Sequence, residues 1–184
     1  MYEALKGDPF YVALEQSAKG DREAMVAYYL FSIAEARRYG RVCVLPEGLI
    51  GISVWSVPLN SKLTQEKSVQ KSEFIKSTMG ETAFTRYSNI CASMARGTKS
   101  VTDHGDWYLS IAGVRPEHQG KGFGKQMIEP VLREADRLGV ASYLETFTEK
   151  NMPFYERLGY RQVASFDEPT SAARYWVMRR CGDV

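Results

Sequence analysis

Three glycines stand at alternate positions in the segment QGKGFG, residues 119–124. An apolar run precedes this segment, and an amphipathic pattern of helical period follows it. Glycine lacks the Cβ atom that keeps a ligand away from the backbone, and the first amides of a helix have no acceptor within the helix. Such amides, together with the helix dipole, bind anions such as phosphate. The segment therefore predicts an anion-binding turn between a strand and a helix, and Lys121 and Lys125 add positive charge beside it.

Two common phosphate-binding motifs do not fit this segment. A Walker A loop needs serine or threonine directly after its lysine, whereas Gln126 follows Lys125. A dinucleotide fingerprint needs a third glycine five residues after the first, and Lys125 stands there when the pattern starts at Gly120. The segment is therefore neither motif. A tight turn that only packs a helix onto a sheet remains the alternative interpretation.

The arrangement that does fit is Gln-Gly-x-Gly-x-Gly placed after Val-x-Pro, which resembles the acetyl-CoA loop of the GNAT N-acetyltransferase family. The resemblance continues at the family's spacing through LET (144–146), Asn151 and FYERLGY (154–160). It therefore covers most of the second half of the chain. Within the family, the stretch from residue 42 to residue 180 is similar to puromycin N-acetyltransferase and its uncharacterised relatives, a likeness that does not carry the substrate with it.

The resemblance implies acetyl-CoA as the cosubstrate and no metal. The end of the strand expected over 107–114 would lie beside the pantetheine arm, as an added strand does. The backbone amides of 120–125 would hold the pyrophosphate, and the helix that begins near residue 151 would touch the far side of the pantetheine. The residues implied in cosubstrate binding are Ala112, Gly113, Val114, Gln119, Gly120, Lys121, Gly122, Phe123, Gly124, Lys125, Asn151 and Phe154.

Acetyl transfer to an amine requires a base for the ammonium and a proton donor for the departing thiolate. The resemblance places Tyr155 at the thioester sulfur, where a hydroxyl with a reference pKa of about 10 can donate a proton. Glu145 is the candidate base, and Asp106 and His104, which also stand near strand ends, remain alternatives. No cysteine lies in the motif region to indicate an acyl-enzyme, so we expect the amine to attack directly in a ternary complex.

The hydrophobic pattern predicts the elements that must position these groups. A helix over 21–39, with Asp21 as its N-cap, is followed by a hairpin that turns at 46–48. Ser, Thr and Lys are frequent in 60–105, where two helices broken near Gly80 are expected. The second half then alternates between strands over 107–114, 141–147, 160–166 and 174–180 and helices that end at Gly139 and begin at Asn151, the expected cap of the latter.

The fold class that the resemblance implies is α/β, with a GNAT-like mixed, mostly antiparallel twisted sheet flanked by helices. The family's first strand has no counterpart, so residues 41–45 would form an edge of the sheet. The length of 184 residues suits one domain, residues 1–184. Within it, 60–105 would be a helical insertion at the acceptor site and 107–160 the acetyl-CoA-binding core.

The composition of the chain argues against several classes of binding partner. The 24 basic and 22 acidic residues leave a net charge of +2, which does not indicate nucleic-acid binding. No apolar run has the length of a membrane span, and the three cysteines and two histidines have no metal-ligand spacing. We therefore expect a cytoplasmic protein without a metal, a nucleic-acid partner or a membrane partner. A homodimer is left open.

The leading hypothesis is an acetyl-CoA-dependent N-acetyltransferase that acts on a primary amine of a small molecule. The sequence does not choose among a small amine or antibiotic, a polyamine and a peptide amino terminus. The alternative is a non-catalytic protein that binds CoA or acyl-CoA as a sensor or regulator. Thiol release from acetyl-CoA in the presence of amines separates the two classes.

Overall fold

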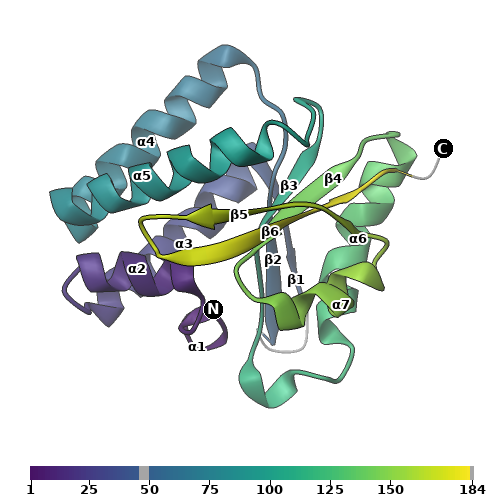
Figure 1. Cartoon of the computed structure of the whole chain (residues 1–184), viewed down its shortest axis with the longest axis horizontal. Helices are drawn as coiled ribbons and strands as arrows, with labels where there is room; N and C mark the ends of the chain where they lie inside the picture. Colours follow the sequence, from purple (N-terminus) through teal and green to yellow (C-terminus); the bar gives the residue numbers. More distant parts are fainter. Residues whose placement is uncertain (46–49, 183–184) are drawn as a thin grey trace.

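The computed structural model describes residues 1–45 and 50–182. In these residues a six-stranded sheet runs in the order β1-β2-β3-β4-β6-β5 (Figure 1). Every pair of neighbouring strands is antiparallel except β3 and β4, which are parallel. This confirms the mixed, mostly antiparallel α/β sheet. The strands are β1 (Gly40–Val44), β2 (Gly51–Ser56), β3 (Trp107–Val114), β4 (Ser142–Thr146), β5 (Arg161–Glu168) and β6 (Ala173–Arg180).

Helices cover both faces of this sheet. The first three precede β1, two long ones connect β2 to β3, and one follows each of β3 and β4 (Figure 1). Single 3₁₀ turns, Pro116–His118 and Glu149–Asn151, lie after β3 and before the last helix. The α-helices are α1 (Tyr2–Leu5), α2 (Pro9–Ser17), α3 (Arg22–Tyr39), α4 (Ser61–Met79), α5 (Glu81–Thr98), α6 (Phe123–Arg137) and α7 (Met152–Glu156).

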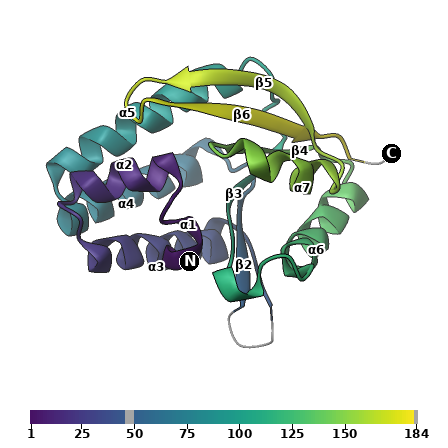
Figure 2. The ribbon, with the colours of Figure 1, turned by 60° about the horizontal axis from the view of Figure 1, so that its bottom comes forward.

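Adjacent strand residues point to opposite faces, and each face has its own hydrophobic core. Trp55 and Leu109 pack with the apolar side of α6, whereas Val54 and Ile111 pack with α2, α3 and the facing ends of α4 and α5. Figure 2 shows α3 and α6 on opposite sides of β2 and β3. A third cluster joins α5 to β6 through Ile90, Met94, Tyr175 and Val177.

A β-bulge in β3 marks the point where the strand's buried side chains change from one core to the other. Trp55 pairs with Leu109 and Val54 pairs with Ile111, which leaves Ser110 as an extra residue in β3. The Ser110 hydroxyl donates to the Val54 carbonyl oxygen at 3.0 Å. An extra residue reverses the side on which the following side chains lie and increases the local twist. The strand therefore changes its direction and its facing residues midway, just before the predicted cosubstrate-binding stretch.

Most predicted elements are confirmed, and the N-terminal helix α2 was missed. Asp21 caps α3 by accepting hydrogen bonds from the amides of Glu23 and Ala24, and Gly80, at φ 90°, separates α4 from α5. The turn of the predicted hairpin falls in 46–49, outside the described residues. The predicted edge position of the first hairpin strand is confirmed, because β1 pairs with β2 alone among the described strands.

Candidate active site

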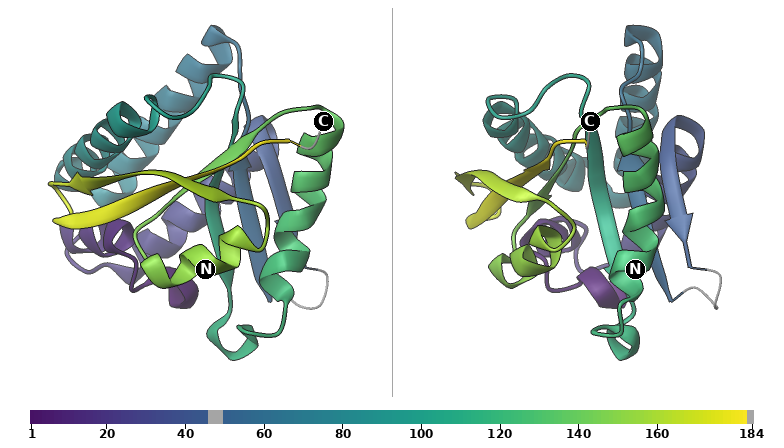
Figure 3. Two further views of the ribbon diagram at one scale, coloured as in Figure 1. Left: turned by 45° about the vertical axis from the view of Figure 1, so that its right-hand side comes forward. Right: turned by 90° about the vertical axis from the view of Figure 1, so that its right-hand side faces the viewer.

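The sheet opens between its two parallel strands. β3 pairs with β4 only over Trp107–Leu109, while its other edge stays paired with β2 as far as Val114. Figure 3 shows β5 and β6 running across the direction of β2 and β3, so the two halves of the sheet diverge strongly. The β4-side edge of residues 110–114 therefore has no strand partner in the described chain. This edge includes Ala112, Gly113 and Val114, the predicted contacts of the pantetheine arm.

The glycine turn lies directly beyond this free edge. Gly120 has φ 75°, and Gly122 has φ 83° and forms the N-cap of α6. A Cβ atom added at either glycine would meet nothing within 4 Å, so the space beside the backbone is open. Among the described residues, the amides of 120–125 donate to no backbone acceptor, and the first such bond in the helix runs from Gln126 N to Gly122 O. The turn thus presents a row of free donors at the positive end of a helix dipole.

The long side chains around the turn bond to their own chain. Lys121 Nζ donates to the Glu117 carbonyl oxygen at 3.0 Å, and Lys125 Nζ lies 3.3 Å from Glu129 Oε1 one turn further along α6. Gln119 Nε2 donates to the Val114 carbonyl oxygen at 3.1 Å and so ties the turn to the end of β3. The hydrogen-bond donors that stay free at the turn are therefore mainly its backbone amides.

Gly124 and Phe154 form a close contact between α6 and α7. A Cβ atom at Gly124 would lie 2.9 Å from Phe154 Cζ, so any larger residue would push the ring away. Asn151 is exposed, lines the cavity and occupies the predicted N-cap position of α7, but its side chain makes no capping hydrogen bond. Its backbone is helical, at φ −85° and ψ −17°, and Pro153 in the first turn of α7 has no amide hydrogen to donate.

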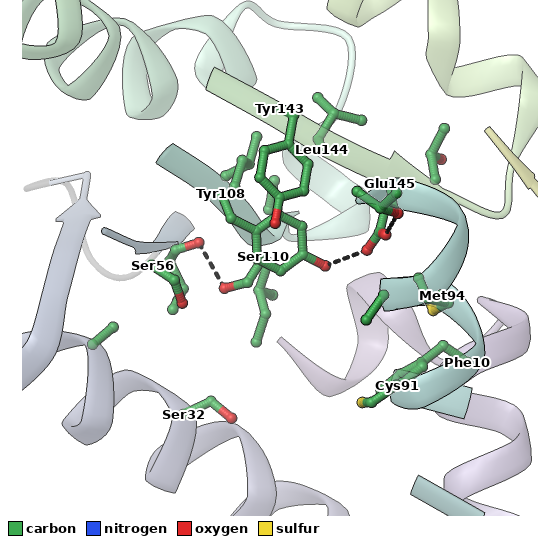
Figure 4. Close-up of a pocket in the computed structure, with 18 of the residues that line it drawn as sticks. Phe10, Ser32, Ser56, Cys91, Met94, Tyr108, Ser110, Tyr143, Leu144 and Glu145 are labelled. Carbon is green, nitrogen blue, oxygen red and sulfur yellow. Dashed lines mark hydrogen bonds between the residues drawn. The ribbon is translucent and has the colours of Figure 1, made fainter. Parts of the chain in front are cut away.

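A cavity of about 870 Å³ extends from the sheet opening between α2, α3, α4 and α5. Its walls include β3 and β4 residues together with aromatic rings from the helices. Figure 4 shows Tyr108, Tyr143 and Glu145 from the strands facing Cys91 and Met94 of α5. The predicted catalytic pair, Glu145 and Tyr155, lines this same cavity.

Glu145 is held by two hydroxyl groups. Tyr108 donates to its Oε2 at 2.9 Å, and Thr98 at the end of α5 donates to its Oε1 (Figure 4). Burial raises the pKa of the Glu145 carboxyl above its ordinary value, and these two hydrogen bonds offset part of that rise. The Glu145 carboxyl group is therefore held in a fixed orientation and is more basic than that of an ordinary glutamate, a property that suits a general base.

Tyr155 lies on α7, with its ring edge-on to Phe154 and Tyr160 at centroid distances of 5.1 and 6.2 Å. Its hydroxyl hydrogen-bonds no other side chain in the described part of the chain, so it is available to a ligand. Burial and the nearby Asp8 carboxylate raise the pKa of Tyr155 to about 12. The phenol therefore stays protonated and can donate a hydrogen bond or proton.

Asp8 is a site residue that sequence reasoning missed. It caps α2 by accepting from the Phe10 amide at 3.0 Å, lines the cavity, and has its pKa raised to about 6 by burial. The signal was present in the sequence, because Asp8 is followed by Pro9 at the first position of α2 and aspartate before proline is a frequent helix start.

The two alternative bases differ from Glu145 in their surroundings. Asp106 is buried and forms an ion pair with Arg179, whose Nε lies 2.7 Å from Asp106 Oδ2, and it also accepts from the Asp103 amide. A carboxylate committed to an arginine in this way stabilises the fold near the mouth. His104 is exposed and lines the mouth of the cavity.

Comparison with known proteins agrees with this geometry. Residues 86–162 match the family described as acetyltransferase (GNAT) domain. This segment contains the free β3 edge, the glycine turn, Glu145 and Tyr155. Residues 86–162 are therefore similar to a GNAT acetyltransferase domain, and the sheet and helices have a GNAT-like fold.

One curated relative is an uncharacterized N-acetyltransferase of Schizosaccharomyces pombe, 31% identical over 116 residues. The match covers 60% of this chain and 47% of the relative, so the chain spans about half of that protein's length. Among solved structures, an acetyltransferase of Corynebacterium glutamicum titled histone acetyltransferase HPA2 and related acetyltransferase aligns with TM-score 0.63 and 16% identity, over 100% of this chain and 87% of that one.

Two further structures share the fold. The polyamine N-acetyltransferase of Drosophila melanogaster aligns with TM-score 0.59 and 14% identity, over 82% of this chain and 78% of that one. A mosquito arylalkylamine N-acetyltransferase-like protein aligns with TM-score 0.52 and 12% identity, over 82% of this chain and 78% of that one.

In the described residues, no three His, Cys, Asp or Glu side chains gather where they could hold a metal ion. No helix there has the length and apolar character to cross a membrane.

Proposed function

We propose that the protein transfers the acetyl group of acetyl-CoA to a primary amine of a small molecule, by direct attack in a ternary complex. The observation that carries this proposal is the alignment of three features along one path. The free donors of the glycine turn lead to the unpaired edge of β3, and that edge leads into the cavity that Glu145 and Tyr155 line.

The residues of this path suit the chemistry of acetyl-CoA. The open space beside Gly120 and Gly122 lets the amides of 120–125 approach a pyrophosphate closely. The free edge of Ala112–Val114 would pair with the amide groups of the pantetheine arm, as in strand addition. Phe154, packed on Gly124, and Asn151 would lie along the other side. Lys121 and Lys125 contribute charge rather than direct contacts.

Acetyl-CoA supplies an activated acetyl thioester and a thiolate leaving group. Glu145 would accept a proton from the substrate ammonium, which frees the nitrogen lone pair for attack on the thioester carbonyl. Tyr108 and Thr98 hold this carboxylate in a fixed orientation. The Tyr155 hydroxyl would then donate to the sulfur as the carbon–sulfur bond breaks. Each proton transfer of this kind typically contributes a factor of about 10²–10⁴ to the rate.

A small acceptor is favoured by the shape of the site. The cavity is walled by α2, α3, α4 and α5, and this wall includes residues of both helices of the predicted 60–105 acceptor segment. The polyamine and arylalkylamine enzymes that share the fold act, by their titles, on small amines. The closer likeness to puromycin N-acetyltransferase stays a prediction.

The test is a screen of the purified protein with acetyl-CoA and a panel of amines, with thiol release as the readout. Thermal unfolding with and without CoA is measured in parallel, because a ligand that binds the folded state raises the unfolding temperature. We expect a CoA-dependent rise and turnover of at least one small amine. A rise without turnover across the panel would support the CoA-binding sensor instead, and no rise would remove the cosubstrate assignment.

Tyr155→Phe tests the proton donor. We expect turnover to fall on the order of 100-fold, because positioning remains when the acid is lost, while CoA affinity stays nearly unchanged. Tyr160→Phe is the matched control, since its hydroxyl bonds to Ser142 in the core and its ring contacts that of Tyr155. Full activity of the Tyr155 variant would reduce this tyrosine to a packing role.

A further inference from the structure

The cavity has a second polar end, away from Glu145, where α4 faces α3. Lys67 and Lys71, one turn apart on α4, flank one carboxylate: their Nζ atoms lie 3.8 and 3.5 Å from Glu35 Oε2 on α3. The side chains of Lys67, Lys71 and Glu35 are only 22%, 12% and 11% exposed. All three line the cavity. We call this set the lysine end of the cavity.

The lysine end is held in place by neutral groups. Lys67 Nζ donates to the Ser56 hydroxyl and Lys71 Nζ to the Ser32 hydroxyl, each at 3.0 Å. Lys71 Nζ also lies over the rings of Tyr28 and Phe31, at 5.0 and 4.8 Å from their centroids. Figure 4 shows Ser32 and Ser56 on the side of the cavity opposite Glu145. The two ammonium groups are therefore fixed and face the same space as the proposed base.

The charges at this end do not balance. Two ammonium groups share one carboxylate, so the lysine end carries one positive charge in excess. Burial lowers the pKa of Lys71, which indicates that the pocket does not fully compensate its charge. Buried charges are normally paired, and an anion placed between the two lysines would complete the pairing. The opposite end of the cavity is acidic, because Asp8 and Glu145 both contribute carboxyl groups there.

We propose that the acceptor is an amine that also carries a carboxylate, an amino-acid-like zwitterion with its amine toward Glu145 and its carboxylate between Lys67 and Lys71. This inference rests on the proposed N-acetyltransferase function and names its substrate class. Aromatic rings, Tyr28 and Tyr87 among them, line the space around the lysine end and would contact an apolar section of the substrate.

Two other acceptor classes have one feature in their favour. Glu35 Oε1 is buried and has no hydrogen-bond partner in the described chain, so it would accept from a hydroxyl or a second ammonium of a substrate. The excess positive charge opposes a second ammonium, since like charges at such short range repel. It also leaves a neutral hydroxyl with less attraction than a carboxylate. Diamines and amino alcohols are therefore the competitors that the experiment must include.

The experiment compares acceptors that differ only at the end remote from the amine. An alkylamine is measured beside the amino alcohol, the ω-amino acid and the diamine of equal chain length, and phenethylamine is measured beside 4-(2-aminoethyl)benzoate, whose carboxylate is at the far end of the ring. We expect kcat/KM to be about 10- to 100-fold higher for the carboxylate-bearing member of each set, the effect of one charged hydrogen-bonded pair. A preference for the diamine or the amino alcohol would overturn the proposal.

Variants then assign the preference to the lysine end. Lys71→Gln and Lys67→Gln should abolish the preference, so that kcat/KM of the carboxylate-bearing acceptor falls to the value of the plain alkylamine measured with the same variant. Lys71→Met keeps the apolar stem against the rings of Tyr28 and Phe31 and guards against loss of folding. Lys62→Gln, on the exposed side of α4, is the matched control. A preference that persists in both lysine variants would contradict the proposal.

Calorimetry separates this inference from the proposed function. If no amine is acetylated, the catalytic proposal fails, but the binding of 4-(2-aminoethyl)benzoate and of the ω-amino acid to the CoA-saturated protein can still be measured. Binding that weakens in Lys71→Gln and not in Lys62→Gln would support the carboxylate site on its own. Absence of binding, or equal binding by both variants, would refute it.

Discussion

The glycine turn and the lysine end of the cavity both present hydrogen-bond donors suited to an anion, but the chain places these donors in two different ways. The turn uses consecutive residues, and its donors are backbone amides that a helix start leaves free. The lysine end uses side chains from α3 and α4 that are far apart in the sequence, with hydroxyl partners on α3 and β2. A site made of backbone leaves a glycine motif that can be read directly. A site made by tertiary packing leaves no local pattern.

The same contrast determines how each region should respond to substitution. Where the backbone binds the ligand, changing a side chain matters only if it alters the conformation of the chain or the space beside it. Where side chains do the chemistry, replacing one functional group without changing the shape of the side chain should be enough to reduce activity. Each of the following predictions tests one half of this contrast.

The largest effect is expected for Glu145→Gln, which keeps the shape of the side chain and removes the basic oxygen. Turnover should fall by about 10²- to 10⁴-fold, the usual contribution of a general base. The wild-type rate should also decrease as the pH falls through the pKa of Glu145, because only the ionised carboxylate accepts a proton. Burial raises that pKa, so the decrease should begin above the range of an ordinary glutamate.

A pH–rate profile of the wild-type protein, the Glu145 variant and Glu149→Gln checks this assignment. Glu149 is an exposed residue of the 3₁₀ turn after β4 and serves as the control. The acidic limb should be present in the wild-type and control proteins and absent in Glu145→Gln. An unchanged limb in that variant would move the base to another cavity residue, with Asp8 next to be tested.

The fold could be predicted where periodicity and capping are local. The paired helices that meet at Gly80, the Asp21 cap and the alternating second half follow from patterns within a few residues. The bulge at Ser110 could not be predicted, because it is defined by the pairing of β3 with β2, and the paired residues are more than fifty positions apart in the sequence. Asn151 is the N-cap residue of α7 as predicted, but its side chain does not cap the helix, because the 3₁₀ turn Glu149–Asn151 holds it in a helical conformation.

The candidate site, like the fold, could be predicted where it depends on a local pattern and not where it depends on tertiary packing. The motif predicted the glycine turn and the place of Tyr155, whereas Glu145 became the candidate base from its position near a strand end; the structure brings Glu145 and Tyr155 to one cavity. It gave no indication that Asp8 from α2 or Glu35 from α3 would line the same space, because those contacts depend on how the helices pack on the sheet. Asp8 carries only the helix-start signal of an aspartate before proline, and Glu35 carries no motif of its own.

A smaller but clear effect is expected for Gly122→Val. Gly122 has φ 83°, which a β-branched residue resists, and its added atoms would occupy the open space beside the amides. Loss of one charged hydrogen bond to a phosphate should weaken CoA binding by about 10- to 100-fold. Gly20→Val is the matched control, because Gly20 has φ 73° and no neighbour within 4 Å of an added Cβ atom, but lies far from the turn.

Isothermal titration with CoA measures this effect, and thermal unfolding of both glycine variants reports the backbone strain that they share. CoA affinity should fall in Gly122→Val and stay near the wild-type value in Gly20→Val. Equal affinity in the two variants would mean that the amides of the turn do not hold the pyrophosphate.

The smallest effect is expected for Lys121→Gln and Lys125→Gln, although both lysines stand within the motif. Lys121 bonds to the Glu117 carbonyl oxygen, and Lys125 pairs with Glu129 on the surface of α6. Exposed charges are screened by solvent and salt, so each substitution should weaken CoA binding by less than about fivefold at physiological ionic strength. The residual effect should shrink further as salt is added, whereas the Gly122→Val effect should persist. A loss from either lysine variant as large as that from Gly122→Val would mean that side chains, rather than the backbone, supply the affinity of the turn.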